Sequence, residues 1–93
     1  MVRTVVLTRQ VQKQLQKLPR HVVVKLQAWV EAVETEGLEA VRKMPGFHDE
    51  PLKGKRQGQR SIRLSHAYRG IYTVKSKGEV GVVRVEEVTK HVY

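Results

Sequence analysis

The chain has 93 residues, no cysteine, a net charge of +9 and a pI near 10.3. This length suits one domain, 1–93, and the lack of cysteine excludes disulfides and thiolate metal sites. No stretch has the ~20 apolar residues of a membrane span, and residues 1–10 lack the apolar run of a signal peptide. We therefore expect a cytoplasmic protein with no membrane partner.

The first half of the chain predicts one strand and two helices. The β-branched run 2–7 is typical of a strand, and Thr8 can cap a helix that continues to Leu18. Pro19 interrupts that helix and can lie in the first turn of a second one, which Gly37 would end. The second helix has a wide apolar face made of Val22, Leu26, Trp29, Val30 and Val33. The segment "LEAVRKM" adds a short helical turn.

The second half predicts a loop and three strands. Residues 45–58 contain two prolines, three glycines and mixed charges, which is typical of a loop. Strands are predicted near 59–65, 68–75 and 79–88. The order β-α-α-β-β-β describes an α+β domain, with two N-terminal helices packed on a mostly antiparallel four-stranded sheet.

Positive charge is concentrated in this second half. Between Pro51 and Gly78 there is no acidic residue, and the basic residues are Lys53, Lys55, Arg56, Arg60, Arg63, Arg69, Lys75 and Lys77. A surface that only confers solubility usually mixes both signs. The clustering therefore predicts a surface that binds a polyanion, most often nucleic acid.

Strand alternation predicts where two of these arginines lie. If Ile62, Leu64, Tyr72 and Val74 face the helices, Arg63 and Arg69 lie together on the open face of the sheet. Two adjacent guanidiniums repel each other unless an anion lies between them, and a phosphate suits their geometry. Arg60 falls on the inward side near the strand edge. The alternative is that Glu86 or Glu87 of the last strand neutralises the arginines.

The other polar residues suit metal-independent RNA cleavage. No acidic constellation for a metal and no nucleotide-binding glycine loop is present, so we expect no metal and no cofactor. His48 lies in the basic loop and His66 at the hairpin turn, whereas His91 and Tyr93 follow the last strand. The attacking 2′-hydroxyl belongs to the RNA, so the protein needs only a base, an acid and positive charge at the phosphate.

The segment "EPLKGKRQGQRSIRLSHAYRGIYTV" resembles the central signature of the RelE/ParE toxin superfamily. The ending "VEEVTKHVY" is similar to the last strand and His/Tyr tail of its ribosome-dependent mRNA interferases, and the overall pattern is HigB-like. The resemblance implies the toxin of a type II toxin–antitoxin pair, which enters the ribosomal A site and cleaves mRNA there by 2′-hydroxyl attack. It implies three partners: a cognate antitoxin encoded beside it, the 70S ribosome and mRNA.

By position, the resemblance gives Arg69 the role of the phosphate-stabilising arginine and places Arg63 as a basic residue on the preceding strand. His91 and Tyr93 match the acid/base region. The basic residues expected to contact RNA without taking part in the chemistry are Lys53, Lys55, Arg56 and Arg60. Some relatives carry a further arginine where this chain has Glu86 and Glu87, and others use a catalytic glutamate that Glu50 matches only roughly.

Two alternatives remain open at the level of sequence. The same fold serves ParE-type inhibitors of DNA gyrase, which bind without cleaving RNA. A non-catalytic RNA-binding module would also explain the charge, but it leaves the His/Tyr tail without a role. The combination of Arg63, Arg69, His91 and Tyr93 favours the nuclease.

Overall fold

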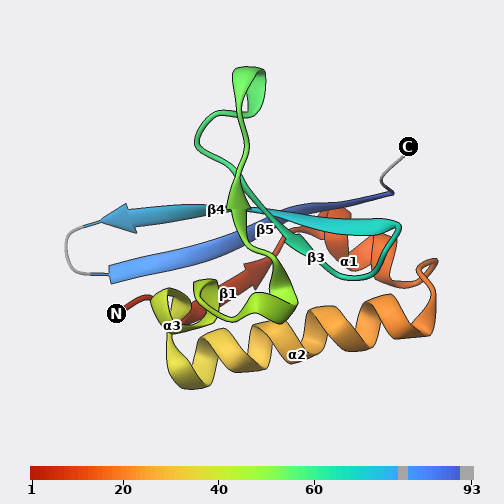
Figure 1. Ribbon diagram of the computed structural model, residues 1–93, viewed down its shortest axis with the longest axis horizontal. Helices are drawn as coiled ribbons and strands as arrows, with labels where there is room; N and C mark the ends of the chain where they lie inside the picture. Colours follow the sequence, from red (N-terminus) through yellow and green to blue (C-terminus); the bar gives the residue numbers. More distant parts are fainter. Residues whose placement is uncertain (78–79, 91–93) are drawn as a thin grey trace.

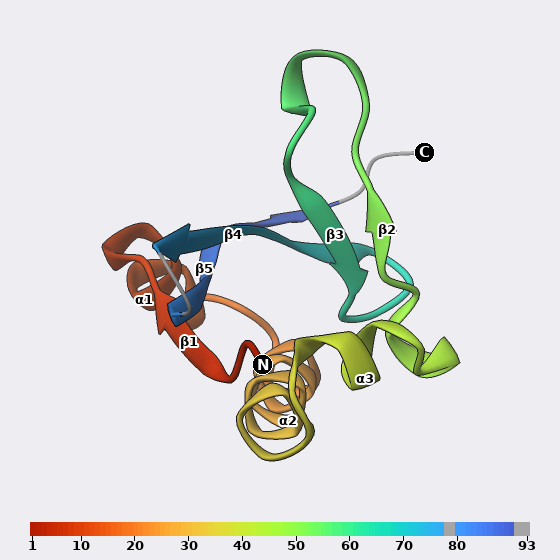
Figure 2. The ribbon, with the colours of Figure 1, turned by 90° about the vertical axis from the view of Figure 1, so that its left-hand side faces the viewer.

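A mixed sheet lies on a long helix. The hairpin of residues 50–63, called the projecting hairpin below, extends from the sheet on the side away from that helix (Figures 1 and 2). The computed structural model describes residues 1–77 and 80–90. The helices are α1 Arg9–Leu15, α2 Arg20–Glu36 and α3 Leu38–Arg42, with 3-10 turns η1 Pro45–Phe47 and η2 Gly54–Arg56. The strands are β1 Thr4–Leu7, β2 Glu50–Pro51, β3 Arg60–Arg63, β4 Tyr68–Lys77 and β5 Val80–Lys90. The predicted α+β class is confirmed.

The sheet has five strands in the order β1-β5-β4-β3-β2. β1 runs parallel to β5, and the other neighbours are antiparallel. The prediction of four strands omitted β2, which pairs only Glu50 with Ser61 and Pro51 with Arg60. Two residues are too few to show an alternating pattern, and Pro51 has no N–H to donate, so the sequence gives no strand signal there.

The helix ends follow the predicted capping residues with small shifts. The Thr8 hydroxyl accepts a hydrogen bond from the Val11 amide, and Gly37 ends α2 with φ +88°. α1 stops at Leu15 rather than continuing to Leu18, and Pro19 caps α2 from outside instead of lying in its first turn. No helix in the described part of the chain is long and apolar enough to cross a bilayer.

The core lies between α2 and the face of the sheet that is turned toward α2. Its fully buried members include Val22, Leu26, Trp29 and Val33 of α2, and Ile62, Tyr72, Val83 and Val85 of the strands. The rings of Trp29 and Tyr72 lie 5.1 Å apart. Val74 was predicted to join this face but is 37 % exposed, because β3 pairs with β4 only as far as Tyr72 and leaves Val74 at an edge.

A β-bulge changes the alternation of β5. Ile71 pairs with Glu87 and Tyr72 pairs with Val85, so one extra residue, Glu86, is inserted. Val85 and Val88 can therefore both be buried although an odd number of positions separates them. The two glutamates between them lie toward the open face of the sheet.

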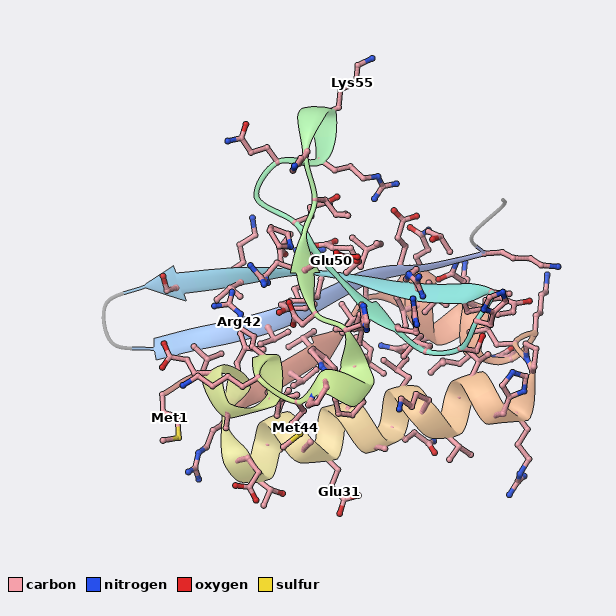
Figure 3. The ribbon with its side chains drawn as sticks, in the orientation of Figure 1. Met1, Glu31, Arg42, Met44, Glu50 and Lys55 are labelled. Carbon is pink, nitrogen blue, oxygen red and sulfur yellow. The ribbon has the colours of Figure 1, made fainter. Side chains whose placement is uncertain are left out.

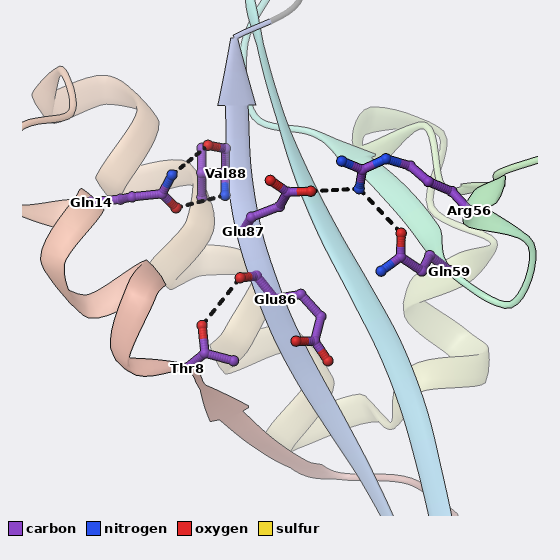
Figure 4. Close-up of polar contacts among 7 residues, drawn as sticks. All are labelled: Thr8, Gln14, Arg56, Gln59, Glu86, Glu87 and Val88. Carbon is purple, nitrogen blue, oxygen red and sulfur yellow. Dashed lines mark hydrogen bonds and ion pairs between the residues drawn. The ribbon is translucent and has the colours of Figure 1, made fainter.

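β1 pairs with only part of β5, and α1 lies along the same edge of β5 where that pairing ends. The last pair of β1 and β5 is Leu7 with Val85. Beyond it, the Gln14 side chain donates to the Val88 carbonyl at 3.0 Å and accepts from the Val88 amide at 2.8 Å. The Thr8 hydroxyl donates to the Glu86 carbonyl at 3.2 Å (Figure 4). These side chains satisfy backbone groups that a neighbouring strand would otherwise satisfy.

Candidate active site

A hollow of about 520 Å³ lies on the open face of the sheet, beside the base of the projecting hairpin. Its lining residues come from β2, the hairpin, β3, β4 and β5: Glu50, Leu52, Arg56, Ser61, Arg69, Ile71 and Thr89. The face lies opposite α2, so α2 does not cover it (Figure 2). The hollow combines two guanidiniums, one carboxylate and two hydroxyls on a rigid sheet.

Arg69 and Arg63 are direct cross-strand partners, as predicted from strand alternation. The Arg69 guanidinium donates to the Ser65 carbonyl at 3.4 Å, a long and weak contact. Glu86 instead accepts from Thr73 and lies near Arg84, while Glu87 pairs with Arg56. Within residues 1–77 and 80–90, no carboxylate pairs with Arg69, and the alternative of neutralisation by β5 is not observed.

Arg63 lines a different, smaller hollow of about 240 Å³, together with Lys25, Gly46, Ser65 and His66. Its Nε is buried and has no hydrogen-bond partner in the described part of the molecule. The structure therefore brings the two arginines together in register, but it places their side chains against separate hollows. His66 belongs to this smaller hollow, whereas His48 is exposed and lines neither.

Arg60 forms an ion pair with Asp49 inside the protein. Its Nε donates to Asp49 Oδ1 at 2.6 Å, and the Tyr72 hydroxyl donates to Asp49 Oδ2 at 2.5 Å. The Asp49 side chain is fully buried, and that of Arg60 is 25 % exposed. The inward position of Arg60 leads it to a buried carboxylate, and its contact with RNA stays a prediction.

Burial also sets the protonation of Tyr72. Removal from water disfavours the phenolate and raises the pKa of Tyr72 to about 12, and the hydrogen bond to Asp49 acts in the same direction. Tyr72 thus remains a neutral donor to the Asp49 carboxylate at physiological pH.

Glu50 faces the opposite way from its neighbour Asp49. Asp49, the residue before β2, turns inward to Arg60, whereas Glu50 lines the hollow that contains Arg69. Figure 3 shows Glu50 where the hairpin leaves the sheet. The sequence offered only a rough match for Glu50, and it gave no reason to single out Ser61 or Thr89, whose positions follow from strand register.

The basic hairpin residues divide into two groups. Lys53 and Lys55 are exposed, and Lys55 lies at the tip of the hairpin, pointing away from the body (Figure 3). Arg56 instead turns back toward the sheet, where its guanidinium lies 2.5 Å from Glu87 Oε1 and donates to Gln59 at 3.1 Å (Figure 4).

Two predicted residues, His91 and Tyr93, lie outside the described residues. In the part that is described, no group of three or more His, Asp or Glu side chains could hold a metal ion. The candidate site is therefore characterised by Arg69, Arg56 and Glu50 around one hollow.

No protein-family model and no curated protein matches the chain, but solved structures do. The YoeB/ParE toxin from Agrobacterium tumefaciens has a TM-score of 0.69 at 21 % identity, covering 96 % of this chain and 99 % of that one. YafQ from E. coli strain BL21(DE3) has a TM-score of 0.69 at 22 % identity, covering 95 % and 92 %. An archaeal RelE–RelB complex from Pyrococcus horikoshii OT3 gives 0.66 at 26 % identity, covering 97 % and 96 %. The chain has the RelE-like fold, and this structural likeness supports the resemblance to the RelE/ParE toxin superfamily.

Proposed function

We propose that this protein is the toxin of a type II toxin–antitoxin pair and that it cleaves mRNA on the ribosome. The observation that carries the proposal is Arg69, a guanidinium in an open hollow without a carboxylate partner among the described residues. An unneutralised arginine on a rigid strand is a preorganised donor for a phosphate. The fold shared with structures described as a toxin and as a toxin–antitoxin complex supports the same conclusion.

The reaction needs no metal. A base removes the proton from the 2′-hydroxyl, the 2′-oxygen attacks phosphorus, and the bond to the 5′-oxygen breaks as that oxygen gains a proton. The products are a 2′,3′-cyclic phosphate and a 5′-hydroxyl. Arg69 would stabilise the charge on the pentacoordinate phosphate. Glu50 lines the same hollow, and its carboxylate would act as the base. His91 and Tyr93 remain the residues predicted for the acid/base region, and with Glu50 as the base one of them would supply the acid.

The shape of the site supports ribosome dependence. As lined by the described residues, the hollow is open on one side, and a site that does not enclose its ligand does less to orient an RNA strand. Lys53 and Lys55 are exposed on the projecting hairpin and can contact rRNA phosphates while the hollow faces the mRNA.

The test is to map new 5′ ends on cellular mRNA after induction, with and without an inhibitor of translation initiation. Cleavage within codons that disappears when initiation is blocked would support the proposal. Unchanged cleavage without translation would refute ribosome dependence. Arrested growth with intact mRNA and inhibited DNA supercoiling would instead indicate a gyrase inhibitor.

We also propose a protein partner that neutralises the toxin. Among the similar structures are complexes described as RelE–RelB and DinJ–YafQ. Arg69, which has no carboxylate partner among the described residues, would attract an acidic segment. Co-expression with the neighbouring gene should yield a co-purifying small protein, whereas normal growth under strong expression of this chain alone would contradict the toxin assignment.

A further inference from the structure

The ion pair between the hairpin and β5 has a consequence for the chemistry, which rests on the function proposed above. Arg56 belongs to η2 at the end of the projecting hairpin, yet its side chain lines the same hollow as Arg69. It is held there by Glu87 Oε1 at 2.5 Å and by Gln59 at 3.1 Å, both through the same terminal nitrogen, Nη1. The sequence places it with Lys53 and Lys55 as a general RNA contact.

We propose that Arg56 binds the scissile phosphate together with Arg69, and that Glu87 positions Arg56 for this role. A guanidinium has five N–H donors in a fixed plane. Glu87 and Gln59 engage only Nη1, which leaves the donors on Nε and Nη2 for an anion in the hollow. One phosphate is then bound by two arginines, one from rigid β4 and one from the hairpin.

The bulge in β5 makes this arrangement possible. Glu87 pairs in register with Ile71, a residue that lines the hollow. Without the extra residue at Glu86, the burial of Val85 would direct Glu87 toward the core instead of toward Arg56. The Glu87 carboxylate thus reduces the freedom of a flexible arginine, and preorganisation of this kind favours the charged transition state.

Glu87→Gln separates positioning from simple electrostatics, because the two effects change different quantities: electrostatics changes RNA attraction, and positioning changes the rate at saturating ribosome. Removal of a negative charge strengthens general attraction to RNA and leaves the rate at saturating ribosome unchanged. If Glu87 positions Arg56, that saturated rate falls by about threefold to tenfold, since a neutral partner holds the guanidinium roughly half as strongly. Glu86→Gln is the matched control, because it removes the same charge one residue away without touching Arg56.

Single-turnover cleavage should be measured at saturating ribosome for Arg56→Ala, Glu87→Gln, their double variant and Glu86→Gln. We expect about a 10- to 100-fold loss for Arg56→Ala. Glu87→Gln should add nothing in the Arg56→Ala background, because its effect passes through Arg56. Equal rates for Glu87→Gln and wild type, or additive losses, would overturn the inference.

A second measurement does not depend on cleavage. The side-chain N–H signals of Arg56 and Arg69 should shift together when inorganic phosphate is titrated into the wild-type protein, followed by NMR. Glu87→Gln should reduce the shift of Arg56 and spare that of Arg69. Joint shifts in a protein that does not cleave mRNA would contradict the proposed function but retain the phosphate site, and shifts of Arg69 alone would refute the site.

Discussion

Two carboxylate–arginine pairs lie on opposite faces of the sheet, and each takes its arginine from the same hairpin. On the inner side, Asp49 is fully buried and pairs with Arg60, whose side chain is 25 % exposed. On the open side, Glu87 is 23 % exposed and pairs with Arg56, which is 47 % exposed. The two ion pairs have similar lengths, 2.6 Å and 2.5 Å, but very different surroundings.

The difference in burial predicts a difference in role. Breaking a buried pair leaves a charge without water, which is strongly destabilising, whereas an exposed pair contributes at most about 1 kcal/mol. The inner pair should therefore determine whether the hairpin is folded onto the sheet. The outer pair, together with Arg69, should affect what the hairpin does to an anion.

The open face gives the largest expected effect, in activity. Arg69→Ala should lower single-turnover cleavage by about 10²–10³, or ~3–4 kcal/mol, because it removes a donor to the developing charge. Arg69→Lys should recover only part of the rate, since an ammonium lacks the planar two-pronged geometry. Ribosome affinity and melting temperature should change little. Near-normal cleavage by a folded Arg69→Ala protein would refute its catalytic role.

The buried pair gives the largest expected effect in stability. Asp49→Ala should reduce the free energy of unfolding by about 3 kcal/mol, because Arg60 and Tyr72 both lose their acceptor. Glu50→Ala, the neighbouring carboxylate on the open face, is the control and should stay within ~0.5 kcal/mol. Urea denaturation of both variants measures the difference. Equal unfolding free energies would remove the distinction between the two faces.

Tyr72 should make the stability of the inner cluster depend on high pH. Its pKa of about 12 lies above the ordinary value of 10, so its stabilising effect is fully present below pH 10. Between pH 10 and 12 the unfolded chain loses this proton first, and up to about 3 kcal/mol of stability is lost as pH rises. Tyr72→Phe cannot titrate, so the gap between wild type and variant should narrow across this range.

Chemical denaturation of wild type and Tyr72→Phe at pH 9, 10, 11 and 12 tests this directly, because the two proteins differ only at position 72. A gap that stays constant with pH would contradict the raised pKa. A gap that widens would mean that the phenolate is preferred in the folded state.

The smallest expected effect belongs to the exposed hairpin residues. Lys53→Ala with Lys55→Ala should weaken ribosome binding and reduce the slope of log affinity against log salt by about 1.5, because each neutralised phosphate contributes roughly 0.7–0.9 to that slope. The rate at saturating ribosome should remain close to wild type. A large fall in that rate would place these lysines in the site beside Arg56.

Much of the fold could be predicted because its signals are local. Local patterns predict the apolar stripe of α2 and its end at Gly37, and also the cap Thr8. Strand alternation likewise predicts that Arg63 and Arg69 lie together. The parallel pairing of β1 with β5 joins segments about eighty positions apart. No local pattern encodes that pairing.

The site was harder to predict, because single residues decide it. Asp49 and Glu50 are adjacent in a loop-like segment, and only the short pairing of β2 shows that one is buried and the other open. The bulge at Glu86 changes the face that Glu87 occupies, which simple alternation cannot give. Arg56 joins the hollow because of that change, so its separation from Lys53 and Lys55 required the structure.

Gln14 has a further consequence, for how copies of the chain meet at high concentration. Past its pairing with β1, β5 would present the bare amide and carbonyl of Val88 to the surroundings. An exposed strand edge of this kind recruits strands from other molecules. The primary amide of Gln14 bonds both the amide and the carbonyl of Val88, as a neighbouring strand would. At this edge of β5, Gln14 thus occupies the backbone groups with which a strand of another molecule would pair.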